Sequence, residues 1–193
     1  KSEGPLHPNN ESELNLWNLP GWQFYLRQGK YKEAERIYRA FYQALLEQQK
    51  TVGHVHKGMP LHNLGLSLYY QGKTKDAIEC FLSAYVEDVI RSNGADDVEQ
   101  GLASKILRGF IGVPSSDLFR VKGFALEISK KGIPNDPLDN LKHENIGPIV
   151  AEIQNRYEKY LSQTWQLEIE GQREIESKNY DASYSIYEKW YIA

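Results

Sequence analysis

The sequence predicts an all-α protein made of antiparallel helix pairs stacked one on the next, and three observations predict it. From about residue 13 onward, apolar residues recur three or four positions apart, as on one face of a helix. Runs of β-branched residues of strand length, bounded by turn residues, do not occur in the sequence. Glycines and prolines divide the chain at intervals that suit short helices joined by tight turns.

The first four helices are bounded by these glycines and prolines. A helical pattern over 14–28 is interrupted by Pro20 and Gly21, so a continuous helix is predicted only over 20–28. We expect a glycine-rich loop and a glycine turn to separate the next three helices, because glycine disfavours the helix interior. Their predicted ranges are 31–50, 60–71 and 74–91.

The second half of the chain is less regular. Residues 132–148 carry three of the eight prolines, and we expect an irregular segment there with only a short helical turn near 138–143. Acidic or serine residues at the start of the neighbouring segments can cap helix N-termini. The predicted helices in this half cover 96–110, 115–131, 149–178 and 180–193.

Composition limits the class of protein. The 193 residues suffice for a single helical domain over 13–193, preceded by a polar tail or linker over 1–12. The 23 Lys and Arg residues against 26 Asp and Glu residues leave a net charge of −3, which by itself indicates no anionic partner. With one cysteine and no apolar run of the roughly 18 residues that a membrane span needs, we expect a cytoplasmic protein that does not bind membranes. The absence of an initial Met indicates part of a longer protein.

Two helix pairs share a pattern of small and aromatic residues. In the pair expected over 59–92, Leu64-Gly65 is followed by a turn at Gly72, then by Ala77 and Phe81. Small residues allow two helices to approach closely, and a large aromatic residue fills the space between neighbouring pairs. The pair over 14–50 repeats the turn and second helix as Gly29, Ala34 and Tyr38, and a weaker copy over 164–193 has Gly171, Ser183 and Tyr187.

This pattern resembles the tetratricopeptide repeat, in which helix pairs stack into a superhelix. The resemblance covers the three pairs over 14–50, 59–92 and 164–193, whereas the helices over 95–163 diverge from it. It implies a concave face, lined by the first helix of each pair, that holds a peptide or partner helix. The residues that it places on this face as the expected partner contacts are Gln23, Arg27, His62, Asn63, Leu66, Tyr69 and Tyr70.

We therefore expect a non-catalytic, protein- or peptide-binding scaffold or regulatory domain. Asn63 has an alternative interpretation as a common repeat residue with a packing role. The basic residues of the subclass that clamps a terminal carboxylate are not matched at these positions. No catalytic sequence motif was found, and we expect no enzyme activity and no cofactor.

A second interpretation is a nucleic-acid-associated or sensory regulatory module of a larger enzyme. Residues 101–131 carry six basic residues against Asp117 and Glu127, with phenylalanines between them. However, residues 163–193 carry six acidic and three basic residues, so the two regions can complement each other within or between molecules. We therefore favour a protein partner over nucleic acid. The basic residues are Lys105, Arg108, Arg120, Lys122, Lys130 and Lys131.

Two further features have alternative interpretations. The histidines His54, His56 and His62 have spacings that could suit a metal, but no carboxylate lies between Lys50 and Lys75, and we expect a solvated loop without a metal. The last helix is rich in apolar residues, which indicates possible self-association through the C-terminal helix. Those residues are Tyr184, Tyr187, Trp190, Tyr191 and Ile192.

Overall fold

The computed structural model describes residues 25–94, 101–131 and 136–192, with side chains described as far as 188. Within these ranges the chain is helical and contains no strand, which confirms the predicted all-α class. The helices are a 3-10 helix at Leu26–Gln28, α2 Tyr31–Val52, α3 Gly58–Tyr69, α4 Thr74–Ser92, α5 Leu102–Lys105, the π-helix η4 Ile106–Phe110, α6 Ser115–Lys131, α7 Pro137–Asn140, α8 Gly147–Glu176 and α9 Tyr180–Ile192.

Most predicted boundaries lie within a few residues of the observed ones. The helix expected over 14–28 is described only from residue 25, where it is a short 3-10 helix, and the tail over 1–12 and Gln23 lie outside the described residues. The helix expected over 96–110 is described from α5, where it continues as a π-helix. In the irregular segment, the described part contains the short helix α7, capped by the Asp136 side chain.

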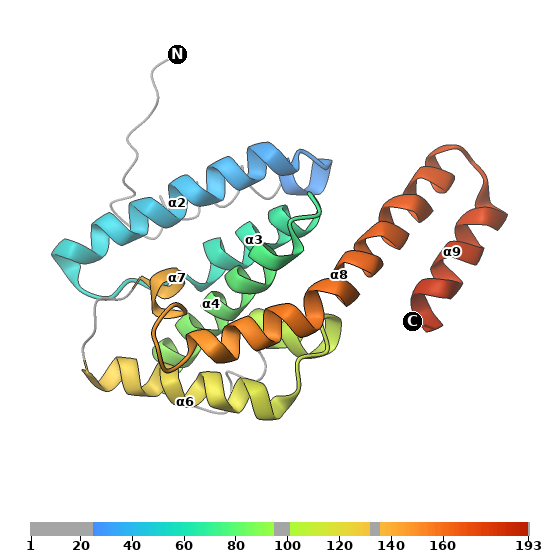
Figure 1. Cartoon of the computed structure of the whole chain (residues 1–193). Coiled ribbons are helices and arrows are strands. Elements are labelled where there is room, and N and C mark those ends of the chain that lie inside the picture. Colours follow the sequence, from blue (N-terminus) through green and yellow to red (C-terminus); the bar gives the residue numbers. More distant parts are fainter. Residues whose placement is uncertain (1–24, 95–100, 132–135, 193) are drawn as a thin grey trace, which may run out of the picture.

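The body of the molecule is built around α4. This helix pairs with α3 and also contacts α6, α7 and the first half of α8, while α2 packs on α3 (Figure 1). The buried face of α4 combines Ala77 and Ala84, where neighbours come close, with large residues such as Phe81 and Tyr85. None of the described helices is long and apolar enough to cross a membrane.

The second half of α8 leaves the body and forms a projecting arm with α9, which comprises residues 166–192 (Figure 1). Among the described elements, α9 packs extensively only on α8. The first half of α8 returns to α4, although α5, α6 and α7 intervene in the sequence. The packing is therefore not a simple series in which each pair contacts only the next one along the chain.

The three turns that the sequence pattern aligns share one geometry. Each has a residue with positive φ, which is 71° at Gly29, 75° at Gly72 and 61° at Lys178. The next residue donates its backbone N–H to a carbonyl five positions earlier, a pattern that ends helices with a left-handed residue. These bonds are Lys30 to Tyr25 at 2.9 Å, Lys73 to Leu68 at 3.0 Å and Asn179 to Glu174 at 2.9 Å.

Close helix packing also recurs in two of the pairs. A Cβ on Gly65 would lie 2.6 Å from the Phe81 ring, and a Cβ on Gly171 would lie 2.9 Å from the Tyr187 ring. In both pairs the aromatic residue follows the glycine by the same number of positions. The pairs α3–α4 and α8–α9 thus share a turn geometry and one close contact between a glycine and an aromatic ring.

Candidate functional site

Three of the predicted contact residues on α3 are buried. The relative exposure is 6% for Asn63, 2% for Tyr69 and 9% for His62. Asn63 forms a hydrogen bond with Tyr38 on α2, which supports the alternative packing role of this residue. In the described structure, α3 is enclosed by its neighbours, and these side chains are not presented to a partner.

The other predicted contacts lie at the end of α3 or beyond it. Leu66 and Tyr70 are half-buried, and the Tyr70 ring stacks on Tyr31 with 4.8 Å between ring centroids. Arg27 is exposed. The Tyr69 hydroxyl donates a 2.9 Å hydrogen bond to Glu168 of α8. Parts of the first, second and third helix pairs therefore meet here in direct contact and not across an open groove.

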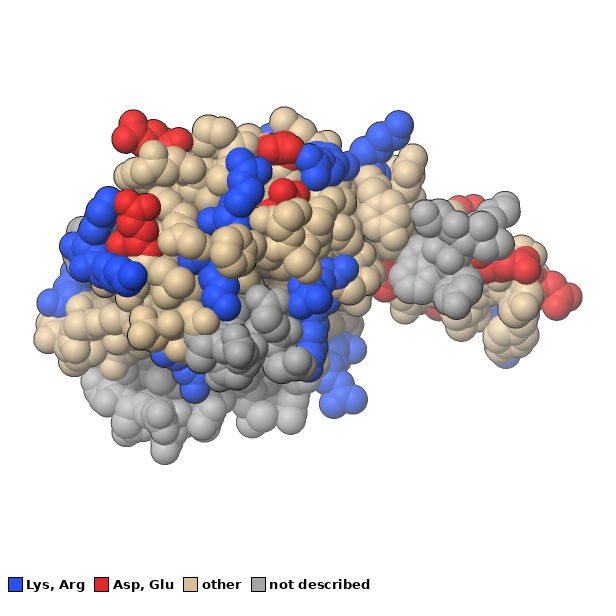
Figure 2. All heavy atoms as spheres, turned by 90° about the horizontal axis from the view of Figure 1, so that it is seen from below, with Lys and Arg blue, Asp and Glu red and all other residues tan. Residues whose placement is uncertain are grey.

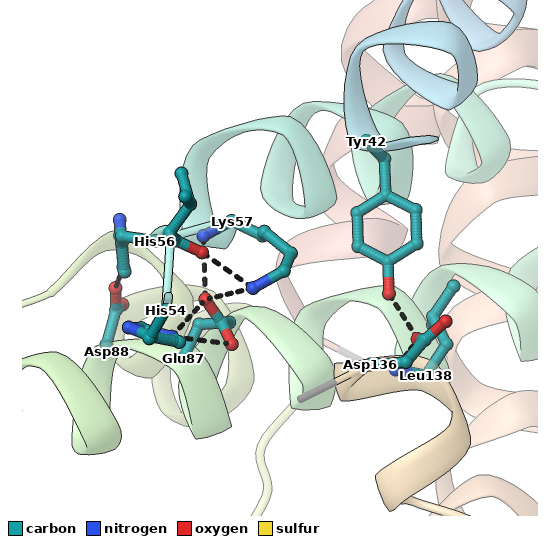
Figure 3. Close-up of polar contacts among 9 residues, drawn as sticks. Tyr42, His54, His56, Lys57, Glu87, Asp88, Asp136 and Leu138 are labelled. Carbon is teal, nitrogen blue, oxygen red and sulfur yellow. Dashed lines mark hydrogen bonds and ion pairs between the residues drawn. The ribbon is translucent and has the colours of Figure 1, made fainter. Parts of the chain in front are cut away.

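A polar cluster joins the loop before α3 to the end of α4 (Figure 3). Lys57 and Glu87 have fully buried side chains, with 3.6 Å between Lys57 Nζ and Glu87 Oε2. The backbone N–H of Lys57 donates to the same oxygen at 2.7 Å, and its Nζ donates to the Val55 carbonyl at 2.6 Å. His54 Nε2 lies 3.3 Å from Glu87 Oε2. Each buried charge thus has several polar partners.

Burial and neighbouring charges shift the pKa values of Lys57 and Glu87 in opposite directions. Burial lowers the pKa of Lys57, although the Glu87 carboxylate opposes this. For Glu87, burial alone would raise the pKa, but the hydrogen bond from His54 and the charge of Lys57 lower it below its ordinary value. The contacts of Lys57 with Glu87 fasten the 53–58 loop to α4.

The two loop histidines are not simply solvated, contrary to the sequence prediction. His56 Nε2 lies 3.0 Å from Asp88 Oδ1, and His54 approaches Glu87. The carboxylates come from α4, some 30 positions along the chain, and were therefore missed when only the surrounding sequence was considered. Among the described residues, no group of three or more His, Cys, Asp or Glu side chains could hold a metal ion.

A second polar contact ties the irregular segment to α2 (Figure 3). The Tyr42 hydroxyl donates a 2.5 Å hydrogen bond to Asp136, whose same oxygen accepts the backbone N–H of Leu138 at 3.1 Å. Burial, together with the Asp136 carboxylate, raises the pKa of Tyr42. Tyr42 and Asp136, like Lys57 and Glu87, were not among the predicted functional residues. The Tyr42–Asp136 bond holds the irregular segment against α2, and the Lys57–Glu87 pair holds the 53–58 loop against α4.

One signal in the sequence could have indicated the buried ion pair. Ala77, Cys80 and Ala84 form a stripe of small residues along α4, and Glu87 continues this stripe at the same helical spacing. An acidic residue in a buried stripe requires a partner, because an unpaired buried charge is costly.

The basic helices form a partly neutralised surface. Lys105, Arg108 and Lys130 are exposed, and Lys122 is half-buried. Arg120 lies 3.8 Å from both Asp117 and Glu152, and Lys131 forms an ion pair with Glu127. Viewed from the side of α6, the body shows many Lys and Arg side chains with a few acidic ones between them, whereas acidic side chains predominate on the arm (Figure 2).

The arm exposes aromatic and acidic side chains. Tyr180 is 64% exposed and Tyr184 is 71% exposed, although both are large and apolar for most of their surface. Asp181 and Glu188 are also exposed, and these four residues share one face of α9 by their helical spacing. We call them the arm face. Tyr187 lies at the edge of this face, where its ring packs against Gly171, and the side chains of Trp190, Tyr191 and Ile192 lie outside the described residues.

No protein-family model, curated protein or solved structure matches the chain significantly.

Proposed function

We propose that the chain is a non-catalytic, protein-binding scaffold and that the arm face binds its partner. The observation that carries the proposal is a comparison of two equivalent helices. Helix α2 and helix α9 are each the second helix of a pair with the same turn geometry. Helix α2 is covered by the next pair, whereas none of the described elements other than α8 packs extensively on α9.

On α2, two side chains at the start of the helix contact the end of α3 and the turn that follows it. Tyr31 stacks on Tyr70, and Glu35 accepts hydrogen bonds from Gln71 at 2.9 Å and Lys73 at 2.7 Å. On α9, the positions equivalent to Tyr31 and Glu35 are Tyr180 and Tyr184. Both are largely exposed. The arm thus presents the surface on which, in the first pair, the second pair is stacked.

The resemblance to tetratricopeptide repeats supports the same proposal, since such arrays bind helices and extended peptides of other proteins. The burial of Asn63 and Tyr69 moves the proposed contact surface from α3 to the arm face. Exposed tyrosines suit this role, because aromatic residues contribute large contact areas at protein interfaces. A helix or helix pair of a partner, laid along α9, is the contact that this geometry favours.

Site-specific photo-cross-linking tests the proposal. A photoreactive amino acid replaces Tyr184 in one variant and Val52, which is 66% exposed at the far end of α2, in a control variant. Irradiation in native cell extract should yield a defined cross-linked protein from position 184 and not from position 52. Equal cross-linking from both positions, or none from position 184, would contradict a binding role for the arm face.

Nucleic-acid binding by the basic helices is a second candidate. It is favoured by the exposed Lys105 and Lys130, and by Phe119, which is 75% exposed and available for stacking on a base. Fluorescence anisotropy with a labelled single-stranded oligonucleotide tests it. Binding through phosphates should weaken steeply between about 50 and about 300 mM salt and should be lost in a Lys105→Glu/Lys130→Glu variant.

A further inference from the structure

The acidic arm and the basic surface of α6 belong to the same chain, but their described residues make no extensive contact with each other. Helix α9 packs extensively only on α8 among the described elements, and the arm projects away from α6 (Figure 1). The opposite charges of these regions are therefore not neutralised by each other within one molecule. Their complementarity remains for contacts between molecules.

The two surfaces also match in the spacing of their charges. On α6, Phe119, Lys122 and Lys130 lie on one stripe by their helical spacing, with about 12 Å between the two lysine positions along the axis. On the arm face, Tyr184 lies between Asp181 and Glu188, which are separated by about 10 Å along α9. Each surface thus combines an exposed aromatic residue with two like charges at nearly the same separation.

The four charged side chains are available for such a contact. Within the described part of the chain, none of Lys122, Lys130, Asp181 and Glu188 forms an ion pair. Phe119 and Tyr184 are both more than two-thirds exposed, at 75% and 71%. A Cβ added to Gly123, on the same side of α6, would meet nothing within 4 Å, so this part of the helix is open to close approach.

From these observations we infer that the arm face of one molecule binds the α6 surface of a second copy, with Asp181 and Glu188 facing Lys122 and Lys130. The inference rests on the proposed binding role of the arm and names its partner. The two surfaces differ, so the contact is head-to-tail and leaves one arm and one α6 surface free in every dimer. Further copies can therefore add to both ends.

Sedimentation velocity of the full chain, over about 10 µM to about 1 mM protein, tests the inference. At about 50 mM salt, the weight-average mass should rise at least about twofold over this range, and at about 500 mM salt the rise should be largely lost, because exposed charges are then screened. A chain that remains monomeric at low salt over the whole range would overturn the inference.

A charge-swap experiment identifies the surfaces. The variants Asp181→Lys/Glu188→Lys and Lys122→Glu/Lys130→Glu should each be monomeric alone, and an equimolar mixture should associate again because the charges are complementary once more. Circular dichroism checks that each variant is folded. If the arm variant loses association while the α6 variant still associates, the contact is arm-to-arm and the inference is overturned.

Failure of this inference can be distinguished from failure of the proposed function. If the chain is monomeric but position 184 cross-links to a different protein, the arm binds a partner that is not a second copy. If the Lys122→Glu/Lys130→Glu variant loses oligonucleotide binding while the unaltered chain is monomeric, the α6 surface serves nucleic acid. Either result overturns the head-to-tail contact.

Discussion

Replacing Gly65 with alanine tests the close approach of α3 and α4. The added Cβ would lie 2.6 Å from Cε1 and 2.9 Å from Cδ1 of Phe81, distances at which some group must move. Phe81 is only 1% exposed, so its ring has little freedom to shift. Adding a carbon to a tightly packed core costs about 1–3 kcal/mol, whereas exchanging glycine for alanine in a helix stabilises by up to about 1 kcal/mol.

The matched control is Gly123→Ala on α6, where the added Cβ would meet nothing within 4 Å. Since both substitutions carry the same gain in helix propensity, the free energy of unfolding should be lower for Gly65→Ala than for Gly123→Ala by about 1–3 kcal/mol. Urea unfolding followed by circular dichroism measures this difference. The additional change Phe81→Leu should recover part of the loss. Equal stabilities of the two alanine variants would refute the close packing of this pair.

Three other predictions concern the polar clusters. Lys57→Met should lower the free energy of unfolding by about 3–5 kcal/mol, because it leaves Glu87 buried without its charged partner, and Lys57→Met/Glu87→Gln should cost less than the two single changes together. The pKa of Glu87 is lowered in the fold, so its contribution to stability is complete above its ordinary value of 4.5 and is lost as the pH falls below it. The urea concentration at the unfolding midpoint should therefore be lower at about pH 4 than at about pH 7. The difference between the two pH values should be smaller in Glu87→Gln. Tyr42→Phe should lower stability by about 1.5–3 kcal/mol in calorimetry, since Asp136 loses a donor, and an unchanged melting temperature would contradict the bracing role of this bond.

Local sequence signals predicted the helices well because they act over a few residues. Gly29 and Gly72 mark turns that require a left-handed backbone, and the small residues Gly65 and Gly171 mark close helix contacts. Lys178 adopts the same left-handed backbone without being a glycine, and the sequence pattern placed it inside the helix expected over 149–178, which ends at Glu176. The all-α class and most helix boundaries therefore follow from the sequence.

The candidate site was less predictable, because it depends on contacts between distant segments. Helical spacing places Asn63 and Tyr69 on a face of α3, but it does not reveal that α2 and α8 cover that face. The pairing of Lys57 with Glu87 joins a loop to the end of a later helix, and no local pattern specifies that partner. The basic charge over 101–131 and the acidic charge over 163–193 follow from the sequence, whereas the separation of the arm from α6 is known only from the structure.

The length of α8 has a mechanical consequence. Its 30 residues extend over about 45 Å, with the part up to Glu168 in contact with the body and the remainder in the arm. Trp165 lies near the point of exit and contacts Gly72 at the turn between α3 and α4, where a Cβ would come within 3.1 Å of the indole. A force on the arm would act through this helix as on a lever with its fulcrum at the turn. A load applied at α9 is thereby transmitted to the turn between α3 and α4.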